Sequence, residues 1–190
     1  MVHDNLDAIR RDVIDRLARA PHEREAALHT PVVATADADA RVMVLRAFDE
    51  ASWLLRFHTD VRSPKVAVVE ADPRIAVLAY DRPAKLQIRL RGKGAILHDG
   101  AVVDAAWEES TRFARRCYLG AGPGETALGP TSGLPPSLEG REPNDAELAP
   151  ARKNFALLMV AVESIDWFCL AHTGHRRAIV TRGSGSWVTP

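Results

Sequence analysis

The strongest constraint on the fold lies in residues 41–65, where two apolar runs are separated by only four residues. The runs span 42–48 and 53–57, and the Asp49–Ser52 segment between them has the length and composition of a short hairpin loop. Strands joined this closely pair in the antiparallel sense. The Ser63-Pro64 dipeptide that follows is typical of a helix N-cap with proline at the first helical position. The sequence therefore predicts an antiparallel strand pair that leads into a helix start.

Further short strands are predicted on both sides of this pair. Residues 85–98 alternate strictly between apolar and polar side chains, which is typical of a strand with one buried face. Gly92 and Gly94 within this strand predict a bulge or a sharp bend. So many short strands favour a barrel over a doubly wound sheet. The other apolar runs bounded by turn residues, which predict the remaining strands, are 32–36, 74–80, 155–162, 165–172, 176–181 and 187–188.

Helices are expected in three places around these strands. Apolar residues at spacings of three and four predict a helix over 4–20, which Pro21 ends. A helix of about two turns is expected from Pro64, and residues 101–119 also have helical character. Between 119 and 140, six glycines and four prolines argue against regular structure. We therefore expect one mainly β, antiparallel barrel domain over residues 1–190, flanked by α-helices.

The charge balance and the cysteine content exclude several classes of protein. The 25 basic and 25 acidic residues cancel, so no overall field attracts a nucleic acid or an anionic membrane surface. Cys117 and Cys169 are too few for a disulfide framework and are expected to be reduced. No apolar stretch approaches the ~18 residues of a membrane span, and the N-terminus lacks a signal-peptide pattern. The sequence predicts a cytoplasmic protein that binds any anion locally.

The clearest candidate site is a phosphate pocket at the strand pair and the helix start. Arginine and lysine are the usual phosphate partners, and hydroxyl groups and free helix N–H groups add to them. Each of these side chains alone could equally be solvated surface charge. The candidates are Arg41, Arg46, Thr59, Arg62, Ser63 and Lys65, joined by the polar face of the 85–91 strand.

No arrangement of catalytic side chains is evident in the sequence. No Ser/His/Asp, Cys/His or paired-carboxylate pattern is defensible, so no catalytic residue is assigned. His58 and His172 lie in strand contexts, and no Cys/His/Asp spacing of a zinc site is present, so no metal is expected. This pattern is compatible with a protein whose chemistry is supplied by a cofactor.

Four motifs resemble, in order and spacing, the pyridoxamine 5'-phosphate oxidase family. They are Arg41-Val-Met-Val-Leu-Arg46, Phe57-His-Thr59, Arg62-Ser-Pro-Lys65 and Leu86-Gln-Ile-Arg-Leu-Arg-Gly92. Each motif is short, but the ordered set is specific. The resemblance implies a split β-barrel, a homodimer, and FMN bound at the subunit interface.

The resemblance also implies roles for the matching positions, all of them in contact with FMN. It places the phosphate at Arg41, Ser63 and Lys65. It places the isoalloxazine ring at the Met43–Arg46 backbone and the Arg46 side chain. The full set of matching ring and pocket positions is Met43, Val44, Leu45, Arg46, His58, Thr59 and Gln87.

The chain also departs from the family pattern. Pro64 stands where the true oxidases carry a phosphate arginine, so Arg62 is the expected substitute. In the C-terminal Arg-x-His-Asp-Arg segment, Ala178 takes the place of the histidine and 179–180 the place of the Asp-Arg pair. This loss argues against pyridoxamine phosphate as substrate. The resemblance implies two further FMN contacts: Phe168, in the aromatic pair Trp167-Phe168 that the chain keeps from the family pattern, and Ser132, in a loop expected to reach the partner subunit's flavin.

Three functions remain open from the sequence. The favoured one is an FMN-dependent oxidoreductase with an unknown small-molecule substrate, because the flavin would supply the hydride chemistry. A flavin-binding or sensing protein without turnover would carry the same pocket, covered by an aromatic or loop lid. Authentic pyridoxamine 5'-phosphate oxidase ranks last. FMN is favoured over the bulkier deazaflavins, which similar barrels bind.

Overall fold

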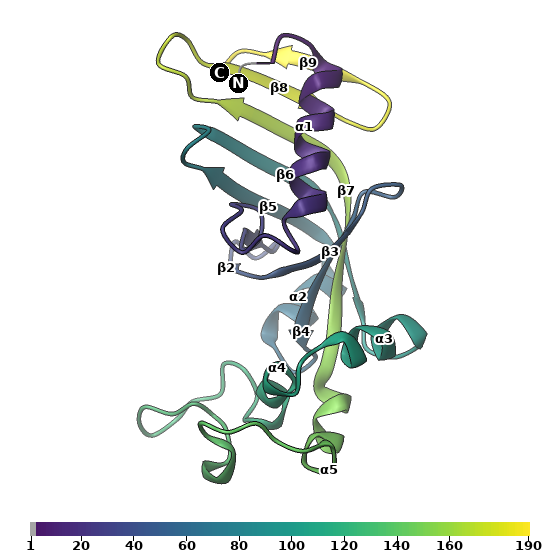
Figure 1. Ribbon diagram of the computed structural model, residues 1–190, viewed down its shortest axis with the longest axis vertical. Coiled ribbons are helices and arrows are strands. Elements are labelled where there is room, and N and C mark those ends of the chain that lie inside the picture. Colours follow the sequence, from purple (N-terminus) through teal and green to yellow (C-terminus); the bar gives the residue numbers. More distant parts are fainter. Residues whose placement is uncertain (1–2) are drawn as a thin grey trace.

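The computed structural model describes residues 3–190, which form one curled antiparallel sheet with flanking helices (Figure 1). The strands are β1 Val32–Ala34, β2 Ala40–Val42, β3 Leu45–Asp49, β4 Leu54–Asp60, β5 Arg74–Asp81, β6 Leu86–Leu97, β7 Phe155–Cys169, β8 Arg176–Val180 and β9 Gly185–Val188. Their order is β2-β1-β5-β6-β7-β4-β3, and β8 and β9 extend the sheet from β7. This half-barrel confirms the predicted mainly β, antiparallel split-barrel class.

One long helix lies against a face of this sheet, and the other helices lie toward the end of the molecule away from the two termini (Figure 1). The α-helices are α1 Leu6–Arg19, α2 Pro64–Ala71, α3 Ala101–Glu109, α4 Arg112–Arg115 and α5 Asp145–Leu148. The short 3₁₀ segments are η1 Arg116–Leu119, η2 Pro136–Leu138 and η3 Ala149–Asn154. Within residues 3–190, no helix has the length and apolar character needed to cross a membrane. The single domain over 1–190 stays a prediction.

The predicted hairpin is confirmed, but the apolar run before it is not one strand. β3 and β4 pair antiparallel, as expected. Val42, however, belongs to β2, which pairs with β1. The chain leaves strand geometry at Met43 and Val44 because the backbone N–H groups of Met43 and Leu45 donate to carbonyls of Pro31 and His29. The prediction of a continuous strand over 42–48 was therefore wrong, since this distant segment captures its backbone.

β7 is a single long strand where two were predicted. It pairs with β4 over its first half, with β8 over its last residues, and with β6 along nearly its whole length. The predicted bulge is confirmed, because the register between β6 and β7 shifts at Gly92. A Cβ atom at Gly92 would lie 2.0 Å from the Ala161 carbonyl oxygen, so only glycine fits there. Because of this bend, β7 can continue as one strand through both parts of the curled sheet (Figure 1).

The predicted helix α1 covers the concave face of the sheet. Asn5 caps it, accepting a hydrogen bond from the Ala8 N–H at 2.7 Å. Its buried side chains, such as Val13 and Leu17, belong to the same core cluster as Ile88 and Trp167 of the sheet. Burial of each such side chain stabilises the fold by roughly 1.5–3 kcal/mol. We call this the inner face of the sheet, and the opposite side the outer face.

A second, smaller core lies at the far end of β7. It joins α3, α5 and η3 around Trp107, Leu148 and Phe155. Of the segment 119–140, predicted to lack regular structure, residues 120–135 have no helix or strand, whereas the short 3₁₀ segment η2 forms at Pro136–Leu138. This end of the molecule therefore places the helical segment after α3 and an irregular loop beside the start of α2.

Candidate functional site

A pocket of about 410 Å³ opens between the β2–β3 connection, β4, the start of α2 and the 110–123 segment. Seven residues predicted from the sequence line it: Arg41, Met43, Val44, Arg46, His58, Thr59 and Lys65. The other lining residues are Val42, Asp60, Ser110, Ala114, Cys117, Tyr118 and Pro123. Five of these come from one segment, 110–123. The break between β2 and β3 explains how Arg41 and Arg46 can both reach this pocket, which a regular strand would not allow.

Cations gather at the α2 end of the pocket. The Lys65 ammonium donates a hydrogen bond of 2.6 Å to the Ser63 hydroxyl, a neutral partner. Burial, together with the neighbouring Arg41, lowers the pKa of Lys65. Ser63 does not cap α2 with its side chain, although the helix begins there as predicted. Arg41 donates to the Thr35 hydroxyl at 3.0 Å and also bonds Asp39. This end of the pocket therefore carries positive charge that an anion can neutralise.

Arg62 does not line the pocket, although the sequence made it the substitute phosphate arginine. Its guanidinium makes a bidentate ion pair with Asp60, at 2.9 and 2.7 Å, and donates to the Gly120 carbonyl at 3.0 Å. The hydrogen bonds to Asp60 raise the pKa of Arg62. Asp60 itself lines the pocket, where a free carboxylate would repel an anion. Arg62 thus contributes indirectly, by neutralising that carboxylate.

His58 and Arg46 provide polar groups without protein partners in the pocket wall. The His58 Nε2 atom is buried without a hydrogen-bond partner, and the ring packs edge-on against Phe155 at 4.9 Å. Burial, together with Arg46 and Arg56, lowers the pKa of His58 to about 3, so the ring is neutral at physiological pH. Across residues 3–190, no hydrogen bond or ion pair engages the Arg46 side chain. A buried polar atom without a hydrogen bond lowers the stability of the fold, so the unpaired Nε2 of His58 points to a ligand that forms the missing hydrogen bond.

Sequence reasoning missed the side of the pocket formed by 110–123. Tyr118 packs edge-on against Phe155 and Trp107, with ring centroids 5.1 and 6.1 Å away. Burial raises the pKa of the Tyr118 hydroxyl. Cys117 is exposed beside it and also lines the pocket. The only sequence signal here was helical character over 101–119, which gives no indication of a ligand.

The remaining predicted residues lie outside the pocket. Leu45 is buried in the main core, so its side chain points away from the site. Ser132 lies in the irregular loop, and its hydroxyl bonds Glu139. Gln87 and Phe168 are paired neighbours on β6 and β7, on the outer face of the sheet. Neither Gln87 nor Phe168 lines the pocket of its own chain.

The outer face carries two rows of side chains that follow from the strand register. The first row runs Tyr80, Gln87, Phe168, Arg177 across β5 to β8. The second runs Val42, Val32, Leu78, Arg89, Asp166, Ile179 across β2 to β8. Val42, Leu78 and Tyr80 are 64%, 38% and 51% exposed, respectively. Because Val42 also lines the pocket, this partly apolar face begins at the edge of the pocket.

The antiparallel half-barrel with a cation-lined pocket beside a short helix agrees with similarities to proteins of known sequence and structure. Residues 8–98 match the family model described as pyridoxamine 5'-phosphate oxidase, FMN-binding domain. This match, which spans slightly less than half of the chain, confirms the predicted resemblance to the pyridoxamine 5'-phosphate oxidase-like, FMN-binding split-barrel family. No curated protein matches the chain.

Solved structures share this architecture. A pyridoxamine 5'-phosphate oxidase-related, FMN-binding protein from Nostoc punctiforme superposes with a TM-score of 0.72 at 22% identity, covering 100% of both chains. PhzG from Burkholderia lata, solved with tetrahydrophenazine-1-carboxylic acid, gives a TM-score of 0.68 at 17% identity, covering 97% of this chain and 92% of its own. A Clostridium acetobutylicum protein related to general stress protein 26 gives 0.54 at 12% identity, covering 92% and 94%. At these identities the likeness establishes the shared fold.

Proposed function

We propose that the protein binds FMN in the pocket beside α2 and is an FMN-dependent oxidoreductase acting on a small molecule. The observation that carries the proposal is the set of cationic and polar groups without carboxylate partners in a pocket of about 410 Å³. Lys65 bonds only a hydroxyl, and His58 Nε2 bonds nothing. In a chain whose family model is named for an FMN-binding domain, these groups fit a phosphate and the polar edge of a flavin.

Each side chain has a distinct part in this proposal. Lys65, Arg41 and Ser63 would hold the phosphate, because Lys65 and Arg41 line the same pocket and Ser63, which bonds Lys65, is the N-cap residue at the start of α2, where helix N–H groups add to the positive field. The 43–46 backbone and the Arg46 guanidinium would meet the ring. FMN, when bound, supplies hydride transfer, whereas the protein orients it and places a positive charge nearby. No acid, base or nucleophile of the chain is required.

We further propose a homodimer in which the outer face of one copy covers the pocket of the other. The apolar members of the outer face, such as Leu78 and Tyr80, are unusually exposed for sheet residues. The face is continuous with the pocket through Val42. In such a dimer, Gln87 and Phe168 would complete the partner's site, although they are remote from the pocket of their own chain.

An absorbance titration of the apoprotein with FMN, combined with size-exclusion mass, tests both proposals. We expect one FMN per chain on a dimer. Dilution that dissociates the dimer should release the flavin, because each site would need both chains. A monomer that keeps its FMN would refute the shared site, and a protein that does not bind FMN would refute the function.

A second candidate is a flavin-binding protein without turnover, which a specific feature supports. The 110–123 segment puts Tyr118 and Pro123 against the pocket, where a lid over the flavin would lie. Stopped-flow reduction by nicotinamide donors, followed by reoxidation, distinguishes the two candidates: an enzyme is reduced and reoxidised rapidly, whereas a sensing protein is not.

Ala178, which stands at the position of the histidine in the true oxidases, is buried in the core. Turnover of pyridoxamine phosphate is therefore not expected.

A further inference from the structure

A buried carboxylate on the outer face holds two arginines. Asp166 on β7 is only 5% exposed. It accepts two hydrogen bonds from Arg177, from Nε at 2.9 Å and from Nη2 at 2.8 Å, and a third from Arg89. Burial works against ionisation of Asp166, but the hydrogen bonds from both arginines outweigh it and lower its pKa. The cluster is therefore ionised and has one positive charge in excess of its carboxylate.

The register of the strands gives Arg177 a defined place. Arg177 pairs with Phe168, and Phe168 pairs with Gln87, so the three share one row of the outer face. The Arg177 guanidinium lies 6.0 Å from the Phe168 ring centroid. The preceding residue, Arg176, pairs with the core residue Cys169 and bonds Asp4 instead. Arg177 is thus the arginine of β8 that stands beside the two residues proposed to reach the partner's flavin.

The contacts of Arg177 leave one side of its guanidinium available. Nε and Nη2 are both committed to Asp166, whereas Nη1 has no hydrogen-bond partner among residues 3–190. A long arginine side chain normally loses much rotamer freedom when it binds a ligand. The bidentate pair removes that freedom in advance, which is how preorganisation raises affinity. Arg89 bonds the same carboxylate from the other side and keeps it charged.

We propose that Asp166 is a positioning residue, which holds Arg177 in the row with Gln87 and Phe168 so that its free Nη1 meets an anionic or carbonyl oxygen of the flavin in the partner's pocket. This inference rests on the proposed FMN site at a dimer interface. Asp166 itself does not touch the cofactor. Its effect on binding passes entirely through Arg177.

A double-mutant cycle on the purified dimer tests this dependence. FMN dissociation constants are measured for the wild type, Asp166→Asn, Arg177→Met and the double variant. We expect each single variant to bind FMN about tenfold more weakly, the loss typical of one charge-assisted hydrogen bond. In the Arg177→Met background, Asp166→Asn should have no further effect. Two losses that simply add, or an Asp166→Asn variant with unchanged affinity, would overturn the proposal.

A matched control separates positioning from stability. Asp81 also bonds an arginine, Arg16, but on the inner side of the molecule. Asp81→Asn should keep FMN affinity within about twofold, although it also removes a carboxylate from an ion pair. Apoprotein melting temperatures are recorded for every variant, since a purely structural Asp166 would lower stability without the non-additive change in affinity.

Three outcomes have different consequences. Should Asp166→Asn fail to fold because two arginines lose their counter-ion, the cycle is run with Arg89→Met present in all four proteins, which removes the surplus positive charge. Wild-type dimer that does not bind FMN would refute the proposed function and this inference together. Wild-type binding combined with additive losses would refute the role of Asp166 alone.

Discussion

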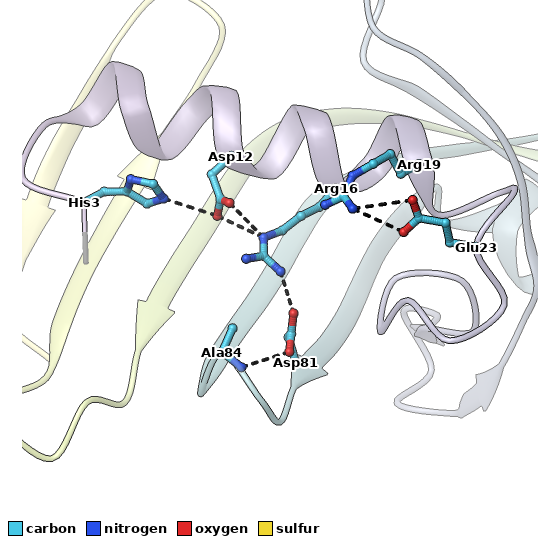
Figure 2. A network of polar contacts seen from close by, with 7 residues as sticks. All are labelled: His3, Asp12, Arg16, Arg19, Glu23, Asp81 and Ala84. Atoms are coloured by element: carbon cyan, nitrogen blue, oxygen red, sulfur yellow. Dashed lines mark hydrogen bonds and ion pairs between the residues drawn. The ribbon is translucent and has the colours of Figure 1, made fainter. Parts of the chain in front are cut away.

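Arg16 and Lys65 show two opposite settings for a cation in the same molecule. Arg16 on α1 donates to Asp12 at 3.0 Å and to Asp81 at 2.5 Å, and Asp81 also accepts from the Ala84 N–H (Figure 2). Burial works against the charge of Arg16, but these two carboxylates outweigh it and raise its pKa. Lys65 bonds only the Ser63 hydroxyl, and its pKa is lowered. One cation is matched with carboxylates, and the other is not.

The difference teaches which cations a ligand can use. The ion pair of Arg16 with Asp81 joins α1 to the end of β5, and together with the pair to Asp12 it leaves little charge for an anion. Lys65 joins no elements and retains charge in a pocket. A count of basic residues does not distinguish Arg16 from Lys65. What distinguishes them is whether a carboxylate lies within bonding distance, and this depends on the tertiary structure.

The largest predicted effect comes from removing the unmatched cation. Lys65→Ala should weaken FMN binding by about 1.5–3 kcal/mol, or roughly tenfold to a hundredfold, because a charge-assisted hydrogen bond to the phosphate is lost. Quenching of flavin fluorescence during titration measures this change. Lys93→Ala is the control, since Lys93 is exposed and its nearest carboxylate, on Glu163, is 3.8 Å away. Equal affinities in both variants would remove Lys65 from the site.

The local features of the pocket could be predicted from the sequence. The β3–β4 hairpin, the start of α2 at Pro64 and the grouping of Arg41 with Lys65 all follow from short patterns of turn residues and cations. Each of these features is formed by residues of the 41–65 segment. These features were therefore available without knowledge of the tertiary structure.

The features that were missed depend on contacts between distant segments. The break at Met43 arises from carbonyls near residue 30, and the continuity of β7 depends on the bulge at Gly92. Arg62 is the exception, because its partner Asp60 lies only two residues before it, and the sequence prediction overlooked this local ion pair. The sequence of the 110–123 wall of the pocket likewise indicates only the end of a helix and the start of an irregular loop, with no sign of a ligand. Pocket walls are tertiary properties, whereas turns and alternation are local ones.

His58 extends the comparison from ligand binding to stability. Its folded pKa of about 3 lies below the ordinary value of 6.5, so between these pH values the unfolded chain binds a proton that the folded chain does not. Unfolding free energy of the apoprotein should therefore fall as pH drops below 6.5, by up to about 1.4 kcal/mol per pH unit from this group. Urea unfolding at pH 7, 6 and 5 measures the slope. His58→Gln should flatten it, and an unchanged slope would contradict a buried neutral histidine.

The smallest predicted effect tests the matched cation. Arg16→Met should lower the unfolding free energy by about 1 kcal/mol, because Asp12 and Asp81 are then left sheltered without a counter-charge, while solvent screening limits the loss. FMN affinity should not change, since Arg16 lies outside the cation-lined pocket. Urea unfolding and FMN titration of the same sample give both values. A loss of FMN affinity as large as that of Lys65→Ala would mean that a cation paired with carboxylates and one without such partners contribute equally to FMN binding, which would contradict the distinction drawn between Arg16 and Lys65.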